Sequence, residues 1–175
     1  VNVNKIAWLR NARGGDYPSI KEFSKICIDS GCQGITVHPR DDMRHINPQD
    51  VKILKELTKE SEVEFNIEGN PFSEKQEKYP GFLQLIKSYQ PDQCTLVPDA
   101  SSQLTSDHGW DLLGDNSRLA SLIKTIKTYG SRVSLFMDPN EEGISKAKEV
   151  GADRIELYTG PYAEAVKQQK GIEGL

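Results

Sequence analysis

Residues 34–40 read GITVHPR, a short run rich in β-branched residues that passes directly into a histidine, a proline and an arginine. The run has the composition of a buried strand. Polar residues placed where a strand ends are where α/β enzymes hold their reactive groups. The same order recurs where strand-like runs begin near Val1, Val63 and Arg154. The stretch therefore predicts an α/β fold whose chemistry lies at the strand ends.

Helix-like segments separate the strand-like ones. Apolar residues recur at helical spacing between the runs, and Asn47-Pro48 has the order of a helix cap followed by a first-turn proline. Strict alternation of strand and helix implies a parallel sheet. The predicted strands lie near Val1, Ile35, Val63, Thr95, Val133 and Ile155, and the predicted helices carry the stripes Ile20/Phe23/Ile26/Cys27, Val51/Leu54/Leu57, Leu83/Ile86/Tyr89, Leu119/Leu122/Ile123/Ile126 and Ile144/Ala147/Val150, with a weaker helix near Tyr162.

Alternate positions along the predicted strands divide into an apolar set and a polar set. A doubly wound sheet, the alternative architecture, has helices on both faces, so a polar set fits it poorly. In a barrel, one set packs on the outer helices and the other faces the interior. We therefore expect the TIM (β/α)8 barrel family, with residues 1–175 forming a single domain of about six βα units, because eight units usually need about 250 residues. The polar set is Asn2/Asn4, Thr36/His38, Glu64/Asn66/Glu68, Ser134/Asp138 and Arg154/Glu156/Tyr158.

Composition argues against some classes of partner. A net charge of −4 and a pI near 5.5 do not favour a nucleic-acid surface. No run approaches the roughly 18 apolar residues of a membrane span, and the start lacks the order of a signal peptide. The expectation is a soluble, cytoplasmic protein that binds neither nucleic acid nor membrane.

Two strand-end residues have side chains suited to proton transfer. A partly desolvated carboxylate at Glu68 would have a raised pKa, which suits proton abstraction near neutral pH. The imidazole of His38 titrates in the range useful for general acid/base work. Each has a purely structural alternative, since Glu68 could pair with a lysine and His38 could hydrogen-bond to the backbone within the core.

The connecting segments carry candidates for phosphate binding. Arg40, Arg44 and His45 form a cationic cluster that would suit a phosphate monoester, although a solvated charge run is the alternative, above all for Arg44. The glycines at the end of residues 9–15 would allow a tight loop that brings Arg13 over a ligand. Residues 99–115 are long for a connection and predict a mobile lid, with functionless disorder as the alternative.

Motifs of other enzyme classes are missing from the sequence. It contains no glycine-rich dinucleotide fingerprint, no phosphate-cradling GK[ST] loop, no nucleophile elbow and no HExxH. Acid/base chemistry on phosphorylated small molecules is the class that remains.

Six motifs, spread over essentially the whole chain, resemble those of the pyridoxine 5′-phosphate synthase family. They are VNVNKIAWLRNARGG, GITVHPRDDMRHI, EFNIEG, TLVPD with Thr105, VSLFMD and RIELYTGPYA. The resemblance implies condensation of 3-amino-2-oxopropyl phosphate with 1-deoxy-D-xylulose 5-phosphate to pyridoxine 5′-phosphate, with release of phosphate and water. It also implies that neither metal nor organic cofactor is needed, and that the protein forms a homo-oligomer, an octamer in relatives.

The same resemblance implies roles for individual residues. His38 and Glu68 correspond to proton acceptors, and Glu156 to a carboxylate that supports charge in the transition state. Asn2 and Arg13 correspond to contacts with the amino-ketone phosphate, and Asn4, Lys5, Arg40, His45 and Thr105 to contacts with the deoxyxylulose phosphate. Many relatives have Asp-His where this chain has Asn4-Lys5, and a smaller residue at Trp8.

A further departure concerns the last part of the barrel. Relatives continue for two more βα units, which provide a proton-donating histidine and a Gly-His phosphate loop. We therefore expect a truncated form of a synthase. The alternatives are another phosphosugar isomerase or aldolase, which as an imine-forming aldolase would use Lys5, and a phosphate-binding fragment without turnover.

Overall fold

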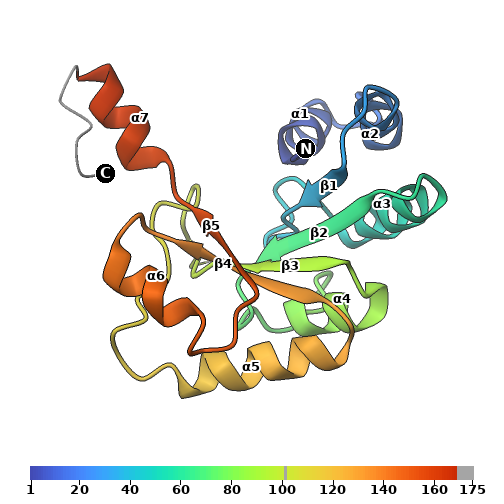
Figure 1. Ribbon diagram of the computed structural model, residues 1–175. Helices are drawn as coiled ribbons and strands as arrows, with labels where there is room; N and C mark the ends of the chain where they lie inside the picture. Colours follow the sequence, from blue (N-terminus) through green and yellow to red (C-terminus); the bar gives the residue numbers. More distant parts are fainter. Residues whose placement is uncertain (101, 169–175) are drawn as a thin grey trace.

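The computed structural model describes residues 1–100 and 102–168. In this part of the chain, five strands alternate with helices, of which there are seven (Figure 1). The strands are β1 (Gly34–Val37), β2 (Glu64–Gly69), β3 (Gln93–Leu96), β4 (Arg132–Met137) and β5 (Arg154–Leu157). The helices are α1 (Asn4–Arg13), α2 (Ile20–Asp29), α3 (Pro48–Glu60), α4 (Phe82–Tyr89), α5 (Ser117–Thr128), α6 (Glu141–Ala147) and α7 (Gly160–Lys167).

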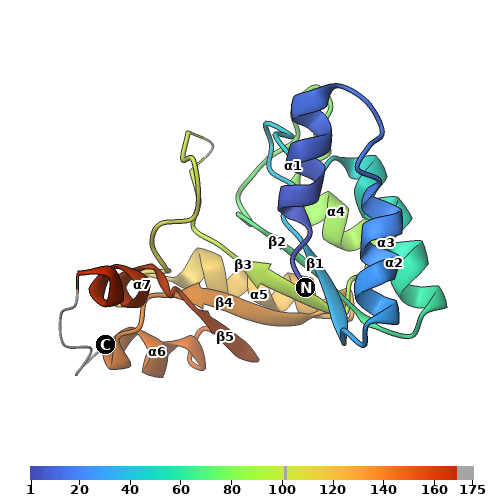
Figure 2. The ribbon, with the colours of Figure 1, turned by 90° about the horizontal axis from the view of Figure 1, so that it is seen from above.

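Every strand pairs in parallel with the strand that follows it in the chain, in the order β1-β2-β3-β4-β5. In a doubly wound sheet, the order in which successive strands are added reverses at a switch point. The strand order found here has no such reversal, which excludes that architecture. Helices α3, α4, α5 and α6 follow one another around one face of the curved sheet, whereas α7 points away from it (Figures 1 and 2). The α/β barrel prediction is confirmed as an open segment of a (β/α) barrel.

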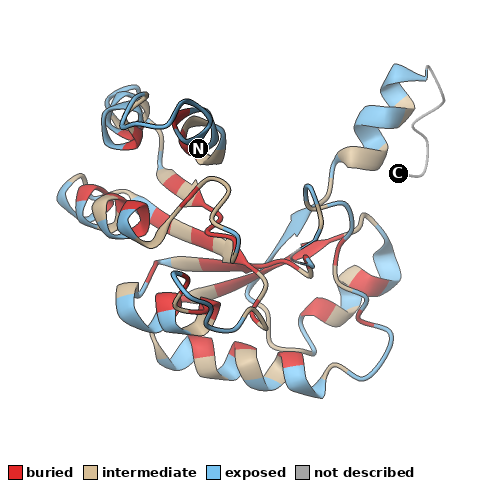
Figure 3. Cartoon of the chain, turned by 180° about the vertical axis from the view of Figure 1, so that it is seen from behind, coloured by how far each residue is buried: buried red, intermediate tan, exposed pale blue. Residues whose placement is uncertain are grey.

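The two sets of strand residues lie on opposite faces, as predicted. Ile35, Phe65 and Leu135 are fully buried in the core between the sheet and the outer helices, and buried residues follow the strands in Figure 3. The inner face carries polar links between neighbouring strands, such as the Asn66 amide, which donates to Thr36 Oγ1 at 3.3 Å. Asn66 Oδ1 accepts from Thr95 Oγ1 at 3.2 Å. The interior is therefore held by hydrogen bonds across strands and the exterior by apolar packing.

The predicted first strand near Val1 is only partly formed. Thr36 N–H donates to Val1 O at 2.8 Å and Val3 N–H donates to Thr36 O at 3.2 Å, so the segment pairs in parallel with β1, but over too few residues to form a sixth strand among the described residues. Asn2 forms only an isolated bridge with Thr36, and the chain then turns into α1. The turn follows because Asn2 Oδ1 accepts the backbone N–H of Asn4 at 2.9 Å, a local contact that competes with strand pairing. Residues 9–15 are likewise not a tight loop, because α1 continues to Arg13 and only Gly14 takes the left-handed conformation, with φ 63°.

The predicted start of α3 is confirmed, whereas the predicted apolar face of α2 is partly exposed. Asn47 caps α3 by accepting from the N–H groups of Gln49 and Asp50, with Pro48 in the first turn. Phe23 and Ile26 belong to the predicted apolar stripe but are 38% and 61% exposed, because α2 lies at the margin of the helical layer and packs on α1 and α3. Nowhere in residues 1–100 or 102–168 is there a helix with the length and apolarity that crossing a bilayer requires.

Strand β5 forms one edge of the sheet. All four of its residues are exposed, including the apolar Ile155 and Leu157, which are 37% and 46% exposed. Their side chains belong to the set that faces helices elsewhere in the sheet. The edge therefore leaves apolar surface and backbone hydrogen-bonding groups without cover from the described residues.

Candidate active site

A cavity of about 810 Å³ lies where the carboxyl ends of the strands meet the first turns of α1. It contains the side chains of all the predicted site residues except Arg13, which lies exposed in the last turn of α1. Its lining residues are Asn2, Asn4, Lys5, Trp8, His38, Arg40, Arg44, His45, Glu68, Val97, Leu104, Thr105, Ser106, Phe136 and Glu156.

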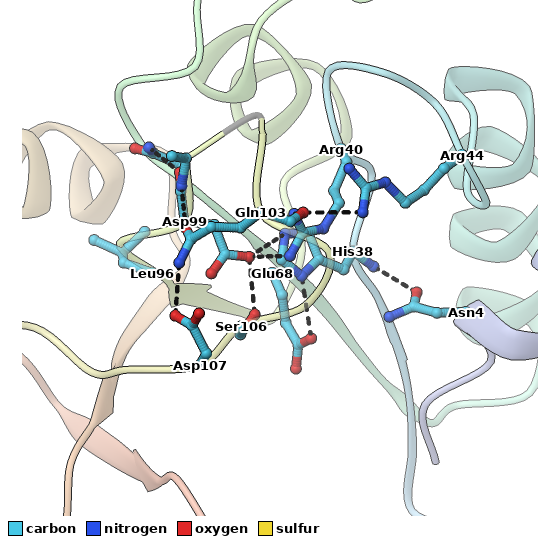
Figure 4. Close-up of polar contacts among 12 residues, drawn as sticks. Asn4, His38, Arg40, Arg44, Glu68, Leu96, Asp99, Gln103, Ser106 and Asp107 are labelled. Atoms are coloured by element: carbon cyan, nitrogen blue, oxygen red, sulfur yellow. Dashed lines mark hydrogen bonds and ion pairs between the residues drawn. The ribbon is translucent and has the colours of Figure 1, made fainter. Parts of the chain in front are cut away.

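His38 directly follows β1 and is buried in the wall of this cavity. Its backbone N–H donates to Asn4 Oδ1 at 2.8 Å, which fixes the strand end against α1. Its two ring nitrogens face two carboxylates, with Nδ1 4.0 Å from Glu68 Oε2 and Nε2 3.7 Å from Asp99 Oδ2 (Figure 4). Burial, followed by the nearby Arg40 cation, lowers the pKa of His38 to about 3. The imidazole is therefore neutral at pH 7 and keeps one nitrogen lone pair, which would become an effective proton acceptor once a bound anion, such as a substrate phosphate, offsets the nearby cations and raises this pKa.

Glu68 projects from β2 toward the same space, and its carboxylate accepts from the Asn2 amide at 3.4 Å. Burial raises the pKa of Glu68 to about 8, and the negative charges of Glu156 and Asp99 add to the effect. The carboxyl group is thus mostly protonated at neutral pH. It can donate a proton first and accept one afterwards.

Glu156 reaches the cavity from β5, at the opposite edge of the sheet from β1 and His38. The residue is exposed as a whole, yet partial burial of its carboxylate raises its pKa. In residues 1–100 and 102–168, no group of three or more His, Cys, Asp or Glu side chains is arranged to hold a metal ion.

The cationic residues lie at one end of the cavity, and the segment after β3 covers them in part. The Arg40 guanidinium is buried and donates to Gln103 O at 3.1 Å. Arg44 Nη1 donates to the carbonyls of Gln103 and Leu104, each at 2.9 Å. Arg44 therefore lines the cavity instead of belonging to a solvated charge run.

His45 and Lys5 complete the positive end of the cavity. Burial, followed by the charges of Arg40 and Arg44, lowers the pKa of His45 to about 4, so this ring is also neutral at pH 7. The Lys5 ammonium lies over the Trp8 ring, 5.2 Å from its centroid, in a cation–π contact on the first turns of α1. Many relatives have a smaller residue at this position, and the contact with Lys5 gives Trp8 a structural role in this chain.

Sequence reasoning missed Asp99 as a site residue. It lies just beyond β3, is 5% exposed, and forms a very short ion pair with Arg40 through Oδ2. The same oxygen accepts from Ser106 Oγ at 2.8 Å. The signal that could have found it is the rule that identified His38, since Asp99 is the first charged residue after a predicted strand.

The long segment after β3 is attached to the sheet at its far end. Trp110 donates its backbone N–H to Phe136 O at 2.9 Å and its indole N–H to Leu96 O at 2.8 Å. Leu104, Thr105 and Ser106 of this segment line the cavity, and Leu104 is 89% exposed. The segment thus lies where the predicted lid would lie, and its movement stays a prediction.

Solved structures share the fold at low sequence identity. Deoxyribose phosphate aldolase from Aeropyrum pernix superposes with a TM-score of 0.53 at 14% identity, covering 81% of this chain and 57% of that chain. Thiamine phosphate pyrophosphorylase from Pyrococcus furiosus gives a TM-score of 0.51 at 12% identity, covering 80% and 54%. At such identities the likeness concerns architecture alone.

Sequence relatives are much closer. Pyridoxine 5′-phosphate synthase from Xanthomonas axonopodis pv. citri (strain 306) is 58% identical over 165 residues, which are 94% of this chain and 65% of the relative. The enzyme of that name from Xylella fastidiosa (strain M23) is 55% identical over 164 residues, 94% of this chain and 63% of the relative. The chain thus spans about two thirds of the length of these relatives. The sequence family described as "Pyridoxal phosphate biosynthesis protein PdxJ" matches residues 1–174, and the chain belongs to this family.

Proposed function

We propose that the protein to which this chain belongs is a pyridoxine 5′-phosphate synthase. It would condense 3-amino-2-oxopropyl phosphate with 1-deoxy-D-xylulose 5-phosphate and release pyridoxine 5′-phosphate, phosphate and water. The observation that carries the proposal is the convergence of His38, Glu68, Glu156 and the cationic cluster on one cavity. The names of relatives with 55% and 58% identity support the same reaction.

The titration states of the two central groups indicate a division of labour. The substrate amine attacks the sugar carbonyl, and protonated Glu68 donates to the oxygen that leaves as water, which gives an imine. Neutral His38 then accepts a proton from carbon, which allows the phosphate group of the sugar to leave. Glu68, now ionised, takes up the next proton during ring closure, and the negative charge of Glu156 stabilises the positive charge that develops on nitrogen.

The positive end of the cavity would hold the phosphate of the sugar substrate. Arg40, His45, Lys5, Asn4 and Thr105 line the cavity and supply N–H and O–H donors for a phosphate monoester. Asn2 lies beside Glu68, where it would contact the amino-ketone. Arg13 is exposed on α1, so a role for it requires a ligand that extends out of the cavity. Fixing both substrates by their phosphates would supply much of the rate through orientation.

We further propose that the chain is one barrel domain that is completed by two more βα units. The uncovered edge at β5 and the share of the relatives' length that the chain spans support this proposal. In the relatives, by resemblance, those units carry the proton-donating histidine and a second phosphate loop. Homo-oligomeric assembly and cytoplasmic location stay predictions.

The test is turnover by two proteins, this chain alone and a chimera that joins it to the remaining third of the 58% identical relative. We expect product from the chimera and little or none from the chain alone. In the chimera, Glu68→Gln should lower kcat by roughly two to four orders of magnitude, the usual scale for a positioned proton-transfer group. Near-normal turnover by this variant would remove Glu68 from its role.

A chimera without turnover, under conditions in which the intact relative is active, would contradict the proposal. Trapping of the substrate on Lys5 by borohydride, with carbon–carbon bond cleavage as the activity, would favour the aldolase alternative. Calorimetry with each substrate on the chain alone separates binding from catalysis.

A further inference from the structure

We propose that Asp99 is a positioning residue for the reaction, whose carboxylate orients the His38 imidazole so that Nδ1 is the atom that accepts the substrate proton. The inference rests on the proposed function for its chemistry. The orientation that it assigns to the ring can be measured without turnover.

The contacts of Asp99 place its carboxylate between two functional side chains. Oδ2 lies 3.7 Å from His38 Nε2 and forms the very short ion pair with Arg40 (Figure 4). The backbone carbonyl of Asp99 accepts from the Asn70 amide at 2.7 Å, and Asn70 directly follows β2. Arg40, which follows β1, thus fixes the carboxylate, and Asn70, which follows β2, fixes the backbone that carries it.

Charge and burial favour one state of the ring. Asp99 and His38 are 5% and 6% exposed, so water does not screen their interaction effectively. A neutral imidazole has one N–H and one lone pair, and the partner of one nitrogen sets the state of the other. At 3.7 Å the two groups interact electrostatically and not through a direct hydrogen bond. A carboxylate still favours the N–H on the side that faces it, so the proton belongs on Nε2.

The remaining nitrogen then faces the reaction space. Nδ1 lies 4.0 Å from Glu68 Oε2, which is too long for a direct hydrogen bond. Its lone pair is directed toward the proton-holding carboxyl and the cavity that both residues line. The opposite orientation would direct a lone pair at a carboxylate and leave the ring without an acceptor atom in the cavity.

The segment after β3 contributes to the same arrangement. Ser106 Oγ donates to Asp99 Oδ2 at 2.8 Å, while Asp99 Oδ1 is buried and has no hydrogen-bond partner among the described residues. A carboxylate that served only to neutralise Arg40 would not need to face His38 or to accept a hydrogen bond from Ser106. The geometry therefore gives Asp99 the role of orienting the His38 imidazole. Arg40 and Ser106 hold the carboxylate in place for this role.

The test uses Asp99→Asn, which keeps the shape of the side chain and removes its charge. The matched control is Asp50→Asn, because Asp50 is also buried and pairs with an arginine, Arg10, at 2.6 Å. Both variants should lose stability. In the chimera, Asp99→Asn should lower kcat by at least about 10-fold and by up to about 10⁴-fold, the loss seen when a carboxylate that orients a general-base histidine becomes an amide, with a smaller change in KM.

The second readout is the ¹⁵N spectrum of the histidine rings in the chain as it is. The sequence has three histidines, so the His38 signals can be assigned by replacing histidines one at a time. We expect Nε2–H in the parent chain and a gain of Nδ1–H in Asp99→Asn, because an amide can donate to Nε2 as well as accept from it. Asp50→Asn should leave the His38 signals unchanged.

The outcomes separate the two proposals. An unchanged His38 spectrum in Asp99→Asn, or a raised KM with parental kcat, would overturn the positioning role and leave Asp99 as a partner of Arg40 alone. Absence of turnover in every protein, including the unsubstituted chimera, would count against the proposed function. The ring spectra would still decide the orientation of His38.

Discussion

Replacing Glu68 by glutamine should change how the stability of the chain depends on pH. The side chain is 12% exposed, and burial raises the pKa of its carboxyl from 4.5 to about 8. The folded chain therefore keeps a proton that the unfolded chain releases above pH 4.5. This contribution to stability is fully present below pH 4.5 and is lost as the pH rises through 8. Glutamine imitates the protonated acid and cannot lose the proton.

The magnitude follows from the two pKa values. Between pH 6 and pH 9, linkage gives a loss of about 3 kcal/mol in the free energy of unfolding for this one carboxyl. His38 and His45 act in the opposite direction, because their pKa values fall from 6.5 to about 3 and about 4. Their contribution is present above pH 6.5 and is lost at acid pH. Only the difference between the parent chain and the variant therefore isolates Glu68.

The assay is urea unfolding of both chains at pH 6 and pH 9. We expect the free energy of unfolding to fall with pH by about 3 kcal/mol more in the parent chain than in Glu68→Gln. Glu64→Gln is the control, since Glu64 lies on the same strand with a side chain that is 51% exposed, and it should behave as the parent does. Equal pH dependence in the parent and in Glu68→Gln would refute the reasoning that a protonated carboxyl is held in the cavity.

Three further predictions concern single side chains. Arg40→Ala should raise the KM for deoxyxylulose phosphate by about 10-fold or more, because a charge-assisted hydrogen bond contributes about 1.5–3 kcal/mol. Steady-state kinetics on the chimera measures this KM, and an unchanged value would contradict the phosphate assignment. Trp8→Leu removes the ring beneath Lys5 and should weaken binding of deoxyxylulose phosphate by about two- to fivefold in calorimetry, as expected for an exposed cation–π contact. An affinity equal to that of the parent chain would show that the ring does not hold the ammonium. Asn47→Ala should lower the free energy of unfolding by about 1 kcal/mol through loss of the α3 cap, measured in urea, and a parental midpoint would show that the cap adds nothing.

Local pattern was sufficient for most of the fold. The alternation of apolar and polar residues in β2, with Phe65 and Ile67 on one face and Asn66 and Glu68 on the other, determines which face packs on helices. That information is contained within a few consecutive residues. The start of the chain could not be read in this way, because its alternation resembles a strand while the Asn2 side chain turns the backbone into α1.

The site was predictable where a residue's role depends on its own strand. His38 and Glu68 end strands and reach the same cavity, which the order of the sequence implies. Asp99 was not predictable in its role, because that role depends on His38 and Arg40, about sixty positions earlier in the chain. The exposure of Ile26 could not be foreseen either, since it depends on which neighbours α2 has.

The chain-order pairing of the strands has a consequence for how the molecule forms. Paired residues lie between 20 and 39 positions apart, from Ser134 opposite Arg154 to Gln93 opposite Arg132. Each new strand therefore finds its partner in the segment synthesised just before it, and closing such short loops costs little entropy. We expect the sheet to grow one strand at a time during translation, so that ribosome-bound intermediates that end after β3 already protect the amides of β1 and β2 from hydrogen exchange.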